Sequence, residues 1–187
     1  MAELEITGCL VDQISQQTDP IGQYYAFIGA PGQDTWLKKQ LDFVQKAEPY
    51  PTGESISSVL WRTMIGDITL DEDEAEEDYG RYFEVYRNFS ESSSSVQKGM
   101  GQEFVSAVRR RSRYRRLCLT QQGYFGGVPE EAEIGDWICM FHGMKLLFVV
   151  RKIGLHFAYI GHSYVHGLMN GEVLLLPHYK QCAITLT

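Results

Sequence analysis

Glycines divide the C-terminal part of the chain into short apolar runs, and this spacing constrains the fold more than any other feature. From Arg115 onward the runs are RRLCLT, GYFGG, DWICMF, KLLFVVRKI, HFAYIGHSYV and EVLLL. Runs rich in branched and aromatic residues, separated by turn signals roughly every 8–12 residues, are typical of strands in small all-β units. The spacing therefore predicts an antiparallel β-barrel or sandwich over residues 115–187.

The preceding part of the chain shows helical periodicity, apart from one segment at its start. Apolar residues around Gly8 predict a strand over about 4–14, with a bulge or bend at the glycine. Apolar residues at helical spacing predict helices over about 34–48, 54–66 and 96–113. A short fourth helix is predicted from an aromatic face formed by Tyr79, Tyr82, Phe83 and Tyr86.

Together these patterns predict one α+β domain over residues 1–187. In this fold, one strand and three to four helices in the N-terminal half, 1–114, pack on the β-rich part, 115–187. Two polar segments, 68–78 and 90–96, are expected to be flexible loops, because the first is strongly acidic and the second is rich in serine.

The length and the cysteine pattern exclude several classes of protein. A chain of 187 residues can bury a core without disulfides or metals. No apolar run approaches the roughly 20 residues that a membrane helix needs, and the first residues lack the pattern of a signal peptide. We therefore expect a cytoplasmic protein without membrane association or cofactor, with reduced thiols at the widely spaced Cys9, Cys118, Cys139 and Cys182.

The charge of the chain is segregated into two runs. The net charge is −7, and residues 71–78, DEDEAEED, are acidic at seven of eight positions. A basic run, RRRSRYRR, holds six arginines: Arg109, Arg110, Arg111, Arg113, Arg115 and Arg116. Clustered arginines beside a tyrosine can bind nucleic acid, which makes nucleic-acid binding one alternative function. The chain also supplies its own anionic partner, so we expect the two runs to attract each other.

The histidines, all in the last third of the chain, do not have the spacing of a metal site. His162 and His166 are four residues apart, but no matched second pair of ligands follows. The stretch GHSYV resembles the nucleophile elbow of serine hydrolases but lacks its closing glycine. A small hydrolase that uses His166 with Glu172 or Ser163 stays an alternative, and it requires those side chains to converge in one pocket.

Three blocks of sequence, in the same order, resemble the C-terminal region of fungal heterokaryon incompatibility (HET) proteins. They are "RRLCLTQQGYFGGVP", "GDWICMFHGMKLLFVVR" and "YIGHSYVHGLMNGE". Upstream, "YPTGESISSVLWRTMIGD" resembles the helical tryptophan-arginine-threonine segment of the same proteins, and "LEITGCLVDQI" resembles the strand before it. The resemblance covers almost the whole chain, whereas the N-terminal HET domain has no counterpart in it.

The resemblance implies a non-catalytic accessory or recognition module in self/non-self recognition or cell-death control. Such a module would bind a protein partner, for example a HET-type domain, or a small signal molecule. Its candidate binding residues are polar members of the matched blocks: Asp136, Arg151, Tyr164, His166 and Glu172. Each also has a structural alternative, such as a turn cap for Asp136, a strand-end ion pair for Arg151 and a wall aromatic for Tyr164.

Overall fold

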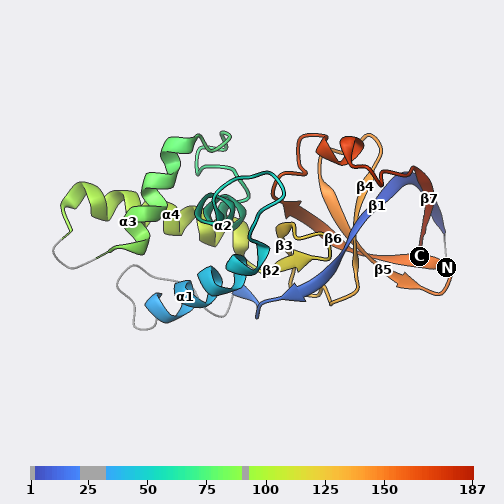
Figure 1. Cartoon of the computed structure of the whole chain (residues 1–187), viewed down its shortest axis with the longest axis horizontal. Coiled ribbons are helices and arrows are strands. Elements are labelled where there is room, and N and C mark those ends of the chain that lie inside the picture. The colour runs from blue at the N-terminus through green and yellow to red at the C-terminus, as the bar shows by residue number, and fades with distance from the viewer. Residues whose placement is uncertain (1–2, 22–32, 90–92) are drawn as a thin grey trace.

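The structure is a computed structural model that describes residues 3–21, 33–89 and 93–187, and of residues 33–35 it describes the backbone alone. The helices gather at one end of the molecule and the strands at the other, as Figure 1 shows. The chain is therefore α+β, as the sequence predicts.

Within the described residues, seven strands form one sheet in the order β2-β3-β6-β5-β4-β1-β7. All neighbouring pairs are antiparallel except β6 and β7, which meet in parallel at Phe157 and Leu186. The apolar runs became strands because their branched and aromatic side chains suit a pleated, half-buried surface. The strands are β1 (Leu4–Gln17), β2 (Arg115–Thr120), β3 (Phe125–Pro129), β4 (Trp137–Phe141), β5 (Leu147–Ile153), β6 (His156–Val165) and β7 (Cys182–Leu186).

The long strand β1 joins both ends of the strand row. Its residues 4–8 pair with β7, its residues 8–13 pair with β4, and its residues 14–17 pair with β2. Successive pairings β1–β2–β3–β6–β5–β4 therefore return to β1. In Figure 1, β1 crosses the full width of the β-rich end of the molecule.

The helices lie between β1 and β2 in the chain, and their ends carry favourable capping residues. Ser55 accepts a hydrogen bond from the amide of Ser58 at the start of α2, and Gly66 ends that helix in the left-handed conformation. Ser94 and Gln97 form a capping box at the start of α4. The elements are α1 (Gln33–Val44), η2 (Gln45–Ala47), α2 (Ile56–Ile65), η3 (Glu77–Tyr79), α3 (Gly80–Arg87) and α4 (Ser95–Ser112).

A continuous apolar core joins the helices to the sheet. Phe83 and Phe104 are fully buried where α3 packs on α4, with ring centroids 5.4 Å apart. The predicted aromatic face is confirmed, since Tyr79 and Tyr86 are buried too and Tyr82 is packed against the same core. This core extends to the sheet through Leu117, Leu119 and Phe125. None of the described helices is long and apolar enough to cross a membrane.

Three expectations about the elements of the chain need correction, and one strand was not predicted. The helical part is not an N-terminal half but an insertion between two strands that pair with each other, because β1 belongs to the sheet. The run EVLLL is not a strand: Glu172–Leu175 form the 3-10 helix η4, which begins after Gly171 at a φ of 92°. The strand β7 has no counterpart among the predicted runs. The predicted loop 90–96 ends earlier, since α4 begins at Ser95, and residues 90–92 lie outside the described part.

Gly8 marks a close approach of two strands instead of a bulge. The register of β1 shifts between Leu10 and Asp12 and again between Ile14 and Gln16. A Cβ atom at Gly8 would lie 2.4 Å from the carbonyl oxygen of Met140 on β4. Glycine is therefore required at position 8 by the spacing between β1 and β4.

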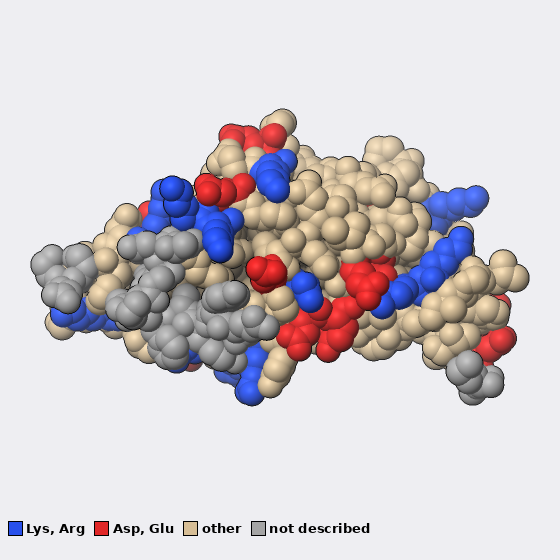
Figure 2. Space-filling view, turned by 90° about the horizontal axis from the view of Figure 1, so that it is seen from below, with Lys and Arg blue, Asp and Glu red and all other residues tan. Residues whose placement is uncertain are grey.

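The acidic and basic runs contact each other, as expected from their charges. The guanidinium groups of Arg110 and Arg111 both lie near the carboxylate of Glu72, and Arg110 also donates to the carbonyl of Leu70. The acidic segment is held by backbone bonds as well, including Ala75 N to Asp67 O at 3.0 Å. On the face shown in Figure 2, basic and acidic side chains of the described residues lie in mixed groups.

We expect Glu72→Gln to lower the free energy of unfolding by no more than about 0.5 kcal/mol, because exposed ion pairs contribute little. It should, however, make stability less sensitive to salt, since screening acts on this pair. Denaturant unfolding at low and high salt measures both effects. Glu76→Gln is the control, because Glu76 is exposed in the same run and no ion pair is seen for it among the described residues. An unchanged salt dependence for Glu72→Gln would contradict the attraction.

Candidate functional site

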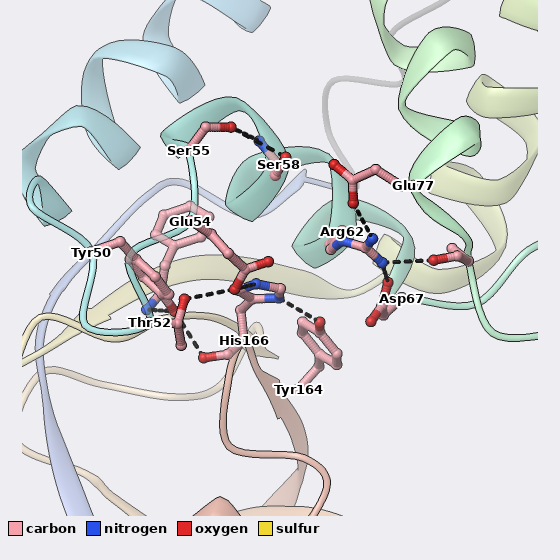
Figure 3. A network of polar contacts seen from close by, with 12 residues as sticks. Tyr50, Thr52, Glu54, Ser55, Ser58, Arg62, Asp67, Glu77, Tyr164 and His166 are labelled. Carbon is pink, nitrogen blue, oxygen red and sulfur yellow. Dashed lines mark hydrogen bonds and ion pairs between the residues drawn. The ribbon is translucent and has the colours of Figure 1, made fainter.

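His166 lies at the centre of a polar network between the helical insertion and the sheet (Figure 3). Its side chain is buried, with Nε2 2.8 Å from Oε2 of Glu54 and Nδ1 2.8 Å from the hydroxyl of Tyr164. A carboxylate can only accept, so Nε2 donates to Glu54. The residues come from the loop before α2 and from the end of β6, which places the network where the two parts of the fold meet.

Tyr50 fixes the backbone beneath this network. Its hydroxyl donates to the carbonyl oxygen of His166 at 2.8 Å and accepts from the amide of Phe125 at 3.2 Å. The amide of His166 in turn donates to the carbonyl of Phe125 at 2.9 Å. Tyr50 is buried, and burial raises the pKa of its hydroxyl, so the group keeps the proton that it donates.

We expect Tyr50→Phe to lower the free energy of unfolding by about 1–2 kcal/mol, because it leaves one buried carbonyl and one buried amide without their partner. Tyr159→Phe is the matched control. Tyr159 is exposed, and its hydroxyl makes no hydrogen bond to any residue that the structure describes, so we expect a change below about 0.5 kcal/mol. Chemical denaturation of both variants measures the difference. Equal stability of the two variants would show that the Tyr50 hydroxyl does not hold the loop to the sheet.

Glu54 and Thr52 connect two sequence blocks that resemble the same family. Burial opposes ionisation of Glu54, but hydrogen bonds from Thr52 and His166 outweigh it and lower the pKa of this carboxyl below its usual value. Thr52 Oγ1 lies 2.6 Å from Glu54 Oε2, and the methyl group of Thr52 packs where a Cβ at Gly167 would stand. The YPTGES segment therefore contacts the YVHG segment directly, although over 100 residues separate them.

A second network lies beside the first and holds α2 to the acidic segment (Figure 3). Arg62 contacts Asp67 at 2.5 Å and Glu77 at 2.8 Å, and it also donates to the carbonyl of Ala75. Burial alone would lower the pKa of Arg62, but the hydrogen bonds that it donates to Asp67 and Glu77 raise it. Arg62 thus fixes the position of the loop that follows α2.

A cleft of about 950 Å³ separates the ends of α2 and α4 from strands β2, β3, β5 and β6. Its walls include Thr63, Asp67 and Arg113 on the helical side, and Gly127 and Tyr164 on the sheet side. Tyr164 therefore takes part in both the His166 network and the cleft wall. Burial, followed by the nearby Asp67, raises the pKa of the Tyr164 hydroxyl, so this hydroxyl stays protonated.

Arg115, held against His162, supplies the positive charge at one corner of the same cleft. Arg115 donates to the carbonyl oxygens of His162 at 2.9 Å and Gly127 at 3.4 Å, and its Nη2 contacts Nε2 of His162. Burial lowers the pKa of both side chains, and Arg115 lowers that of His162 further. The basic run is thus divided: Arg110, Arg111, Arg113 and Arg115 line the cleft, whereas Arg109 and Arg116 do not.

Asp136 and Arg151 lie away from this cleft and contact each other. Both oxygens of Asp136 lie 2.9 Å from nitrogens of Arg151, and one of them accepts from the amide of Glu133 at 2.8 Å. Asp136 is buried, and Arg151 also contacts Glu133 at 3.0 Å. These contacts match the structural roles considered for the two residues, a turn cap and a strand-end ion pair; a ligand role for them stays a prediction.

The second candidate carboxylate, Glu172, does not join the His166 network. Its Oε2 accepts from the amide of Asn170 at 2.6 Å and so closes the turn before η4. Ser163 is buried, and its Oγ has no hydrogen-bond partner among the described residues. The carboxylate that contacts His166 is Glu54, and the hydroxyl is that of Tyr164, so the set His166, Glu172 and Ser163 is not assembled in this structure.

The pattern of the sequence indicated part of this site. Tyr164 and His166 were candidates, whereas Tyr50, Glu54, Arg62 and His162 were not. Their contacts join distant segments, and only the resemblance of the YPTGES and tryptophan-arginine-threonine segment pointed to that region. Among the described residues, no three histidine, cysteine or acidic side chains are grouped so as to hold a metal ion.

Comparison with known proteins gives one match. The family model described as the Het-6 beta-barrel domain matches residues 71–181, which run from the acidic segment through η4. This range covers more than half of the chain and includes the Tyr164–His166 pair, Arg115 and most of the cleft wall. No curated protein and no solved structure matches the chain.

Proposed function

Because this chain belongs to the Het-6 β-barrel domain family, we propose that it is a non-catalytic recognition module of the heterokaryon-incompatibility type. It acts in the cytoplasm, in self/non-self recognition or cell-death control, by binding a HET-type domain or a small signal molecule. The observation that carries the proposal is the cleft of about 950 Å³ between the helical insertion and the sheet. A concave surface of this size with a few polar groups is the usual form of a binding site.

The arrangement around the cleft supports binding by a preorganised surface. Tyr50 and Glu54 hold the helical loop against the end of β6, and Arg62 holds the acidic segment against α2. The strand pairings return to β1, which supports a closed β-barrel as the base of the module. A closed barrel has no unpaired edge strand, so its register is well fixed. Both walls of the cleft are therefore attached to rigid elements, which reduces the entropy lost on binding.

The contacts of His166 favour binding over hydrolysis. A serine hydrolase needs its nucleophile within hydrogen-bond reach of the histidine, and no bond between Ser163 and His166 is seen. The hydroxyl that does contact His166 belongs to Tyr164, whose pKa is raised by burial. A protonated phenol is a poor nucleophile, so we assign the Glu54–His166–Tyr164 chain a positioning role.

The proposal is tested by measuring binding of a separately expressed HET-type domain, and of a protein-free fungal metabolite extract, to the full chain. A variant with Arg113→Glu and Lys145→Glu reverses two exposed charges that line the cleft, one directly after α4 and one in the turn between β4 and β5. The control carries Lys98→Glu and Lys152→Glu, which make the same change in net charge at exposed positions outside the cleft.

We expect wild type and control to capture the domain, or to gain thermal stability with the extract, and the cleft variant to lose that response. A response that survives the cleft substitutions, or no response from wild type, would overturn the proposal. Hydrolysis of 4-nitrophenyl acetate that disappears in Ser163→Ala or His166→Ala would favour the hydrolase alternative. Salt-sensitive binding of DNA or RNA lost with the arginines of the basic run would favour nucleic-acid binding.

A further inference from the structure

A bulge in β6 turns two of its side chains to the same face of the sheet. Phe148 of β5 pairs with His162, and Val150 of β5 pairs with Tyr159, and residues that pair across two strands share a face. Phe148 and Val150 point to one face because they are two residues apart. His162 and Tyr159 are three residues apart and would point to opposite faces in a regular strand. The register shift before Val150 supplies the extra residue in β6 that aligns them.

Both side chains reach the surface beside a buried aromatic ring. Tyr159 is 51% exposed, and its ring centroid lies 6.0 Å from that of Phe148, which is 8% exposed. His162 is exposed as well. Bulges commonly aim a side chain at a functional position. Tyrosine is enriched in protein interfaces, because its rigid ring buries a large area at low entropic cost. The bulge therefore presents an aromatic contact surface.

Arg115 on β2 brings a positive charge to this face of β6. It donates to the carbonyl oxygens of His162 at 2.9 Å and Gly127 at 3.4 Å, and it contacts the ring of His162. These contacts use three of its five N–H donors. Burial lowers the pKa of Arg115, and only the nearby Tyr159 opposes this lowering. The guanidinium is thus held beside Tyr159 and His162 with two donors left for a partner.

The turn before β5 extends this surface. Lys145 is exposed and Leu146 is 46% exposed, and both line the cleft together with His162 and Arg115. Neither Lys145 nor Arg115 forms an ion pair with a residue that the structure describes. We call Tyr159, His162, Arg115, Lys145 and Leu146 the β6 patch. It combines exposed apolar and aromatic surface with two positive charges that lack a counter-charge.

The charges of the β6 patch are complementary to a few carboxylates and not to a long polyanion. Two unmatched cations suit one or two acidic side chains. Nucleic acid needs a row of cations along its phosphates. Here, however, Glu72 and Glu74 of the acidic run line the same cleft and would repel a phosphate backbone. The exposed Tyr159 and Leu146 add apolar contacts, which a polypeptide can match.

We propose that the β6 patch docks an acidic segment of a protein partner, with carboxylates beside Arg115 and Lys145 and apolar side chains against Tyr159 and Leu146. This inference rests on the proposed function and names the chemistry of its protein partner. Arginine binds carboxylates through paired N–H donors, and the sheet already holds the Arg115 side chain in place. Little side-chain entropy is therefore lost when the carboxylate binds.

The probes are peptides selected on the immobilised full chain from a random-peptide display library, and their binding is then measured in solution by fluorescence polarisation. The first variant is Tyr159→Ala. Its matched control is Ile153→Ala, because Ile153 is 55% exposed on the same β5–β6 hairpin but lies outside the β6 patch. The second variant is Arg115→Met, with Arg116→Met as control. Arg116 is also half-buried and also donates to two carbonyls, yet it does not line the cleft.

We expect the selected peptides to be enriched in Asp and Glu beside apolar residues, and to bind wild type and both controls alike. Tyr159→Ala should bind them at least about tenfold more weakly, as for an aromatic anchor of an interface. Because Tyr159 is exposed, this variant keeps the test valid if Arg115→Met does not fold. Peptides without acidic enrichment, no selected peptide at all, or equal binding by wild type and Tyr159→Ala would overturn the inference.

The charge contribution is tested by replacing each Asp and Glu of a selected peptide with Asn and Gln. We expect wild type to bind the neutral peptide about fivefold to tenfold more weakly at low salt, and Arg115→Met to show a smaller difference between the two peptides. Added salt should reduce the difference in wild type. A single-stranded RNA oligonucleotide that binds more tightly than the acidic peptides, and is lost with Arg115→Met, would contradict the inference and favour nucleic-acid binding.

The two proposals can fail separately. If no acidic peptide binds the β6 patch while capture of the HET-type domain still depends on the cleft, the inference about the partner is wrong and the recognition function stands. If neither the peptides nor the domain respond to the substitutions, both are wrong.

Discussion

Replacement of Gly126 by alanine is expected to lower the free energy of unfolding by about 3 kcal/mol, the upper end of the usual cost of overpacking. A Cβ at this position would lie 2.6 Å from the carbonyl oxygen of Tyr164 and 3.2 Å from a methyl group of Val165. The first contact is with backbone, so β3 and β6 would have to move apart. That movement would also displace the end of β6, which carries His166.

Gly127→Ala is the matched control for this prediction. The two glycines are adjacent on β3 and both buried, but a Cβ at Gly127 meets nothing closer than Thr63 O at 3.9 Å. We expect a change within about 1 kcal/mol, because alanine fits there without strain. Denaturant unfolding of the two variants measures the difference. Similar losses for both would show that the close approach of β3 and β6 does not limit the side chain at Gly126.

Asp136→Ala is expected to cost about 3 kcal/mol of unfolding free energy. The carboxylate is buried and accepts two bonds from Arg151 and one from the amide of Glu133. Removal leaves the Arg151 charge without its partner, and such losses are large at buried sites. Because the Arg151 side chain is 31% exposed, water offsets part of the loss, and we place the effect at the low end.

Glu133→Gln provides the comparison for Asp136. Glu133 contacts the same arginine at 3.0 Å, but its side chain is 67% exposed, so we expect a loss below about 1 kcal/mol. Both variants are measured by chemical denaturation in one buffer. A loss for Glu133→Gln as large as that for Asp136→Ala would contradict the claim that burial makes the Asp136 pair important.

The β-rich part of the fold was predictable because its signals are local. Glycine turns and branched residues lie within each run, and β2 and β6 coincide with the apolar runs RRLCLT and HFAYIGHSYV. The exceptions depend on distant contacts. The four apolar residues of EVLLL cannot distinguish a strand from a 3-10 helix. The strand β7 is defined by its pairing with β1, at the other end of the chain.

Of the His166 network, only the residues at the end of β6 could be predicted from the sequence. Tyr164 and His166 stand in a conspicuous stretch, GHSYVHG, so they could be singled out from it. Their partners could not: Glu54 is 112 residues from His166, and Tyr50 is 116 residues from it. Arg115 was predicted as part of a basic run, but its contact with His162 arises from the order of strands β2, β3 and β6.

The most direct test of the central claim, that the cleft is the recognition site, is chemical-shift mapping by two-dimensional NMR. Spectra of the full chain are recorded with and without the protein-free fungal metabolite extract, and with and without the HET-type domain. We predict that with at least one of them the largest changes fall on the amides of Gly127, His162 and Ser163, which line the cleft. Changes centred on the exposed hairpin at Ile153 and Leu155, or no change with either, would contradict it.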